Sequence, residues 1–260
     1  MIADAAYSED YVEYIVEYNG DSSALMAFYT PDQIRLIDSR YAVVFQRKPA
    51  DHMESFSRLE YTLFPKVYGP MDDVGALEAI GAVNIQQQSI LGLTGEGMLL
   101  GIVDCGLDIY NGAFLREGRK SRILAAWDQT IEGTDAATYG YGLEYSAEEI
   151  QAAIDEERRI ITDVTGHGTF CGETMSVAVD ADIIMVKLKQ AKQNLRELYG
   201  IPQEPVACSE VDIMTAIAYL LRIQHMLKRP MCVLVAWGSN SGSHTGAGAL
   251  EKYIHNIGDL

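Results

Sequence analysis

One stretch in the first half of the chain decides the fold: Leu99-Leu100-Gly101-Ile102-Val103-Asp104-Cys105-Gly106. Its apolar run, 99–103, predicts a buried strand, which an acid and a glycine turn bring to an end. Similar apolar runs predict strands over 123–127, 182–188 and 231–237, with helices over part of 76–90 and over 146–159, 167–176, 209–228 and 246–256. Strands that alternate with helices predict an α/β fold, a doubly wound parallel sheet covered on both faces.

The first 70 residues follow a different pattern. Strands are expected over 11–18, 33–37, 41–46 and 59–64, and helices over 22–29 and 50–57. This β-α-β-β-α-β order suits a small two-layer α+β domain. Residues 70–73 contain a proline and two aspartates and predict an exposed junction. We therefore expect one domain over residues 1–70 and a second over residues 74–260.

Size, charge and cysteines limit the possible functions. A chain of 260 residues, of which 48% are hydrophobic, can bury one sizeable core and a small extra domain. The net charge of −17 and the absence of a basic patch argue against nucleic acid as a partner. The sequence has no apolar run long enough for a membrane span, and residues 1–10 do not resemble a secretory signal. The four cysteines lack metal-ligand spacing and are expected to be reduced thiols: Cys105, Cys171, Cys208 and Cys232.

A second motif, Gly166-His167-Gly168-Thr169, places a histidine between two glycines. A serine hydroxyl is a poor nucleophile until an imidazole takes its proton, and a carboxylate can hold that imidazole in the required tautomer. An aspartate at a strand end, followed along the chain by this histidine, suits those two roles. We therefore interpret Asp104 and His167 as catalytic residues. Taken singly, each also fits a structural role, as a turn carboxylate and as a histidine at a helix start.

Together and in this order, the two motifs resemble those of the subtilisin-like serine peptidases. Residues 182–188 resemble the strand that follows the catalytic-histidine helix in that family. The resemblance implies that a polypeptide substrate is held extended against one strand, formed here by Val235, Ala236, Trp237 and Gly238. It also implies that residues 1–70 are a propeptide that acts as an intramolecular inhibitor. No cofactor is implied; structural calcium is common in the family, but no compact loop of oxygen ligands is evident.

Residues 122–130 and 242–246 are similar to segments of clostridial subtilases, including the germination proteases of spores. Because the sequence shows neither a secretory signal nor a membrane span, we expect a cytoplasmic or spore-associated protein. The chain departs from the family pattern at Asn111-Gly112, where His-Pro is common, and at Ala236, where Ser is common. The interval between the two motifs implies an insertion over 132–159. No Gly-Thr-Ser tripeptide follows the histidine, so we expect this chain alone, an incomplete catalytic domain, to hydrolyse no peptide.

Other interpretations stay open at this point. The chain could be a catalytically dead relative that binds a peptide or a partner peptidase, or a binding module on a doubly wound sheet. A cysteine hydrolase would use Cys105 or Cys171 as its nucleophile. Residues 238–242 superficially resemble a nucleophile elbow, but the second serine is one place too late, and we expect a loop. Asp163 is expected to be a loop acid, and four histidines to be structural or solvated: His52, His225, His244 and His255.

Overall fold

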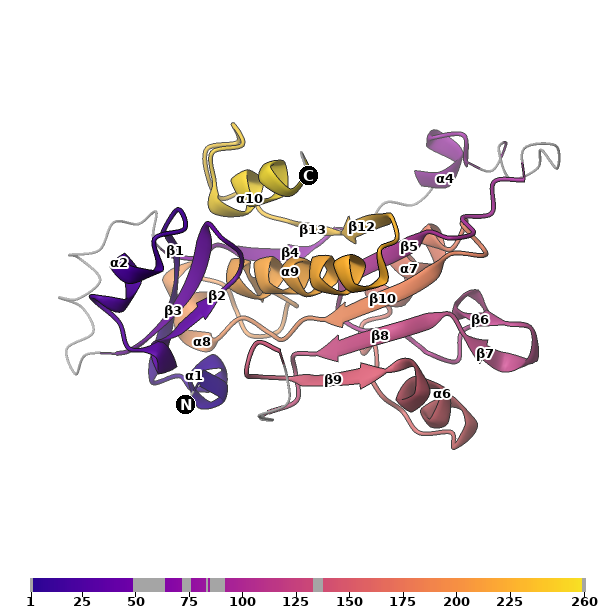
Figure 1. Ribbon diagram of the computed structural model, residues 1–260, viewed down its shortest axis with the longest axis horizontal. Coiled ribbons are helices and arrows are strands. Elements are labelled where there is room, and N and C mark those ends of the chain that lie inside the picture. The colour runs from indigo at the N-terminus through magenta and orange to yellow at the C-terminus, as the bar shows by residue number, and fades with distance from the viewer. Residues whose placement is uncertain are drawn as a thin grey trace.

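The computed structural model describes residues 2–48, 64–71, 76–82, 84, 92–132 and 138–258. Its centre is a five-stranded sheet in the order β12-β5-β10-β8-β9 (Figure 1). Four of its strands run parallel: β5 (Leu99–Asp104), β8 (Ile123–Asp128), β10 (Asp182–Lys187) and β12 (Met231–Val235). The fold is therefore of the predicted α/β class, with a sheet that is mainly parallel.

The edge strand β9 (Leu143–Ser146) corrects the expectation of a wholly parallel sheet, because it pairs antiparallel with β8. It lies in the predicted insertion over 132–159. A parallel neighbour usually needs a helical crossover, and the described residues between Asp128 and Leu143 contain no helix. The insertion thus extends the sheet at the edge opposite β12.

Helices cover both faces of the sheet, as predicted. On one face lies α9 (Glu210–Leu227), which begins where the Ser209 side chain accepts a hydrogen bond from the amide of Val211. On the other lie α6 (Ala147–Asp155) and α7 (His167–Met175). Neighbouring residues of β5 alternate between the two faces. Val103 belongs to the buried hydrophobic cluster that contains residues of α9, and Ile102 belongs to the one that contains residues of α6.

Helix limits differ slightly from the expected ones. The capping box that Ser146 and Glu149 predicted is present at the start of α6, which ends at Asp155 rather than at 159. The expected helix over 246–256 is α10 (Ala249–Gly258). Of the helix expected within 76–90, the described residues show α4 (Ala76–Ala79). The remaining short elements are α8 (Gln193–Leu198), η1 (Pro31–Gln33), η3 (Gly112–Phe114), β6 (Leu115–Arg116), η4 (Glu117–Arg119) and β7 (Lys120–Ser121).

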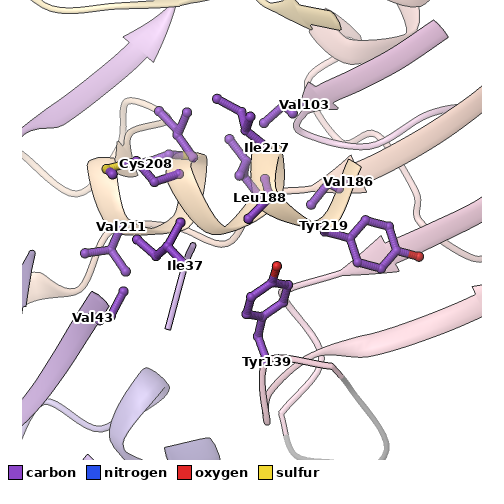
Figure 2. Packing of buried hydrophobic residues seen from close by; sticks show 14 of the residues in the cluster. Ile37, Val43, Val103, Tyr139, Val186, Leu188, Cys208, Val211, Ile217 and Tyr219 are labelled. Carbon is purple, nitrogen blue, oxygen red and sulfur yellow. The ribbon is translucent and has the colours of Figure 1, made fainter. Parts of the chain in front are cut away.

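The N-terminal unit has a three-stranded antiparallel sheet in the order β1-β3-β2. Its elements are α1 (Ile2–Tyr7), β1 (Tyr11–Glu17), α2 (Ser22–Met26), β2 (Ile34–Leu36) and β3 (Tyr41–Arg47). The helix expected over 50–57 lies outside the described residues, as does most of the strand over 59–64. Ile37 and Val43 of this unit pack in the same buried cluster as Val211 of α9 (Figure 2). The division into domains at residues 70 and 74 stays a prediction.

Of the expected exposed junction over 70–73, Pro70 and Met71 are exposed, and residues 72 and 73 lie outside the described residues. Residues 67–70 themselves are paired with other strands. They form strand β4 (Val67–Pro70), the middle strand of a three-stranded antiparallel sheet. Its neighbours are β11 (Cys208–Ser209) and β13 (Trp237–Gly238). Pro70 is accommodated because it stands at the end of the strand, where its missing N–H costs no interior ladder bond. Across the described parts of the chain, no helix combines the length and apolarity needed to cross a membrane.

Candidate active site

Asp104 and His167 meet at the carboxyl end of the central strand. Asp104 is the last residue of β5 and His167 the first of α7, and their Oδ1 and Nδ1 atoms lie 2.7 Å apart. Both side chains are buried. The helix can come this close because residue 168 is glycine: a Cβ there would collide with the carbonyl oxygen of Gly106. The structure thus brings together the two residues that the sequence motifs singled out.

The carboxyl group of Asp104 is held in place by two donors. Its Oδ1 accepts a hydrogen bond from the Cys105 amide at 2.7 Å as well as the one from His167 Nδ1. Burial raises the pKa of Asp104, and these hydrogen bonds oppose that rise. Because a carboxylate only accepts hydrogen bonds, this arrangement requires a proton on Nδ1 of His167. Asp104 therefore orients the ring and fixes its protonation at Nδ1.

Asp163, expected to be a loop acid, organises the start of α7. Its Oδ1 accepts hydrogen bonds from the amides of Thr165 and Gly166, and its Oδ2 from the amide of Thr169 at 2.8 Å. Burial alone would raise the pKa of Asp163, but these hydrogen bonds outweigh it and lower the pKa. The sequence signal for this role was an acid with threonine two residues on, just before a helix start.

The four residues expected to bind substrate lie beside this pair. Val235 ends β12, Ala236 follows it, and Trp237 and Gly238 form β13. The indole of Trp237 donates a hydrogen bond to the Val103 carbonyl at 3.0 Å, which ties β13 to the strand that carries Asp104. The rings of Trp237 and His167 are 6.0 Å apart between centroids. Their role in binding substrate stays a prediction.

The chain's own segment 67–71 lies along β13. Gly69 pairs with Gly238 and Pro70 with Trp237, and the Met71 amide donates to the carbonyl of Ala236 at 2.9 Å. The carbonyl oxygen of Met71 lies 3.2 Å from Nε2 of His167. A Cβ at Gly238 would collide with the Met71 side chain, so glycine makes room for it. Sequence reasoning missed this contact, because pairing between residues so far apart leaves no local pattern.

Two thiols lie close to the pair. The Sγ atom of Cys171, one helical turn after His167, is 3.8 Å from Nε2 and 3.9 Å from Nδ1. Burial and the neighbouring Asp104 carboxyl raise the pKa of Cys105 to about 12. A thiolate nucleophile at Cys105 is therefore disfavoured, which weakens the cysteine-hydrolase alternative for that residue. All four cysteines are thiols rather than members of a disulfide, and Cys232 is exposed whereas the other three are buried.

The remaining histidines belong to other parts of the fold. His225 lies in the last turn of α9, and His255 lies in the last turn of α10. His244 lies in the loop before α10, with its Nε2 atom 3.2 Å from the Asn240 carbonyl. His52 lies outside the described residues. Their expected structural or solvated roles stay predictions.

Among solved structures, the chain is similar to the CspB protease of Clostridium perfringens, with 25% sequence identity and a TM-score of 0.56. The match covers 71% of this chain and 38% of the chain of that protease, so this chain spans well under half of its length. No protein-family model matches the chain, and no curated protein matches it. The similarity shows that the chain has a subtilase-like fold, that is, the fold of a protease.

Proposed function

We propose that this chain is the N-terminal part of a subtilisin-like serine endopeptidase, with its own residues 1–70 as propeptide. One observation carries the proposal: the segment that ends at Met71 lies on β13 as an extended peptide, with its carbonyl oxygen 3.2 Å from Nε2 of His167. A strand added to a sheet edge is a common way to hold a polypeptide substrate. The subtilase-like fold supports the same function.

The chemistry assigns a role to each member of the pair. His167 would take the proton of a serine hydroxyl through Nε2, while Asp104 holds Nδ1 and stabilises the imidazolium that forms. The serine oxygen would then attack the carbonyl carbon of a peptide held by 235–238, and the leaving amine would take the proton from His167. That yields an acyl-enzyme, which water hydrolyses. No Gly-Thr-Ser tripeptide follows His167 in residues 168–260, so the proposal assigns the serine to a segment beyond them.

The position of Met71 indicates which bond the propeptide presents. Nε2 of His167 faces the Met71 carbonyl oxygen, and Nδ1 faces the Asp104 carboxylate. Both partners are acceptors, so a ring that carries both protons satisfies both contacts. The catalytic base has this protonation state after it has taken the serine proton. We therefore assign Met71–Asp72 as the bond that is cleaved when the propeptide is removed.

A cytoplasmic or spore-associated location remains part of the proposal.

The proposal is tested by the intact mass of the native protein and by the coding sequence beyond Leu260. We expect a continuation with Gly-Thr-Ser and a mature form that begins at Asp72; His167→Ala in the same polypeptide should stay unprocessed. The 260-residue chain alone should not react with a fluorophosphonate probe. A stop codon after Leu260 with a matching mass would contradict the proposal and would leave the alternative, a catalytically dead relative that binds a peptide or a partner peptidase.

A further inference from the structure

Asp104, Cys105 and His167 present three metal-ligand atoms to one small volume. A carboxylate oxygen, the Sγ atom and a ring nitrogen all lie within 4.8 Å of one another, and all three residues are buried. Carboxylate, thiolate and imidazole are the donors that proteins use to bind zinc, at about 2.0–2.3 Å from the ion. Hard cations such as calcium take oxygen ligands instead, so a sulfur and a nitrogen donor select the softer ion.

A second observation points to the same place. The Oδ2 atom of Asp104 is buried and accepts no hydrogen bond from any residue that the structure describes. The whole side chain has 0% of its surface exposed. A buried carboxylate oxygen without a partner is costly, and such groups are usually paired or bound to a metal. The hydrogen bonds of this carboxylate are made by Oδ1, which leaves Oδ2 available.

We propose that Asp104, Cys105 and His167 bind one zinc ion. Coordination by Nδ1, the ring nitrogen that faces Asp104, displaces the Nδ1 proton to solvent and leaves the proton on Nε2 in place, and Cys105 also loses its thiol proton to solvent. The carboxylate and the thiolate then carry two negative charges, which balance the two positive charges of the ion. The proton on Nε2 points to the Met71 carbonyl, 3.2 Å away, so that contact is still a hydrogen bond when the ion is bound. No other group needs to gain or lose a proton.

Zinc at this site would keep the proposed peptidase inactive, and this consequence rests on the proposed function. A ring that coordinates zinc through Nδ1 and carries its proton on Nε2 cannot accept a proton from serine. The Cys105 Sγ atom lies within 4.8 Å of a ring nitrogen of His167 and of a carboxylate oxygen of Asp104. Cys171 also contacts the ring but lies outside the three-residue group. It provides a matched control, a thiol against the same histidine.

The test uses the purified 260-residue chain, freed of metal, with zinc binding measured by isothermal titration calorimetry. We expect one zinc ion per chain, and binding at least ~10-fold weaker for Cys105→Ser and for Asp104→Asn, because changing even a residue that only hydrogen-bonds to a metal ligand has an effect of that size. Cys171→Ser and Cys232→Ser should bind like the unmodified chain. Cobalt serves as a spectroscopic probe: a thiolate-to-cobalt charge-transfer band should appear with the unmodified chain and be absent with Cys105→Ser. Circular dichroism would show that each variant is folded.

Three results would overturn the inference: no zinc binding, binding that Cys105→Ser leaves intact, or binding that Cys232→Ser removes. None of them depends on peptidase activity. If the coding sequence ended at Leu260, the peptidase proposal would fail while the zinc titration kept its meaning. If zinc did not bind, processing after Met71 could still be observed. The two proposals therefore fail separately.

Discussion

Lys192→Met should weaken the packing of the N-terminal unit against the rest of the molecule. The Nζ atom of Lys192 lies 2.9 Å from Oε1 of Glu13 and donates hydrogen bonds to the carbonyls of Ala5 and Tyr11, at 2.9 and 3.0 Å. All three partners belong to the N-terminal unit, whereas Lys192 precedes α8. Methionine has a similar length but no charge and no donor, so the substitution removes these contacts with little change in packing volume.

The magnitude follows from burial. The two side chains have 6% and 4% of their surface exposed. Burial would raise the pKa of Glu13, but Lys189 and Lys192 outweigh it and lower the pKa, so the carboxylate is charged. Burial lowers the pKa of Lys192, which Glu13 opposes only in part. Removing Lys192 leaves Lys189 as the one buried cation facing both Glu13 and Asp212, and breaking a buried ion pair typically costs about 3–5 kcal/mol.

The free energy of unfolding in urea measures this cost. With a slope of about 2.5 kcal/mol per molar urea, the midpoint should fall by about 1–2 M. The double variant Lys192→Met with Glu13→Gln should lose less than the two single variants together, because the pair interacts directly. Lys120→Met, at an exposed position in β7, is the matched control and should leave the midpoint unchanged. A loss below about 1 kcal/mol for Lys192→Met, measured in the same way, would refute the reasoning.

Two further substitutions test how α7 is positioned. Gly168→Ala should cost about 1–3 kcal/mol, because its Cβ would meet the Gly106 carbonyl, whereas Gly112→Ala, with open space around it, should melt like the unmodified chain. Equal melting temperatures for the two variants would contradict this. Asp163→Ala should cost about 1–2 kcal/mol near neutral pH, because it removes the hydrogen bonds at the start of α7. The pKa of Asp163 is lower in the folded state, so its contribution is present above about pH 4 and is lost as the pH falls through the folded pKa. The difference between the two proteins in urea unfolding should therefore narrow on acidification; a constant difference would be evidence against the hydrogen-bonded carboxylate.

The sequence was sufficient to predict those helices and strands whose sequence signals are local. The apolar run before Asp104 predicted β5, and Ser146 and Glu149 predicted the start of α6; the structure shows both. Asp104 and His167 could be paired because their two motifs, in this order and at a strand end and a helix start, fit an acid that orients a general base. The antiparallel direction of β9 was not predictable in this way. A short run of β-forming residues carries no information about its partner strand.

Strand β4 is the clearest example of a feature that local sequence patterns cannot predict. Proline and two aspartates at 70–73 predicted an exposed junction, and Met71 is indeed 59% exposed. Yet residues 67–70 pair with β11 and β13, which are well over a hundred residues away along the chain. Backbone groups of a strand can be satisfied by any extended segment, whatever its side chains. The composition of residues 67–70 therefore could not show that β11 and β13 would pair with them on either side.

The docking of the N-terminal unit therefore affects whether residues 67–71 stay bound along β13, beside His167. The register of β4 joins only two residue pairs to β11 and two to β13, and each backbone hydrogen bond adds little net stability. Held by these contacts alone, a free peptide of this sequence would bind weakly. The buried ion pair of Lys192 and the shared apolar cluster keep the segment attached, which gives it a high effective concentration at His167. The contacts that keep Met71 beside His167 thus lie mostly outside the site itself.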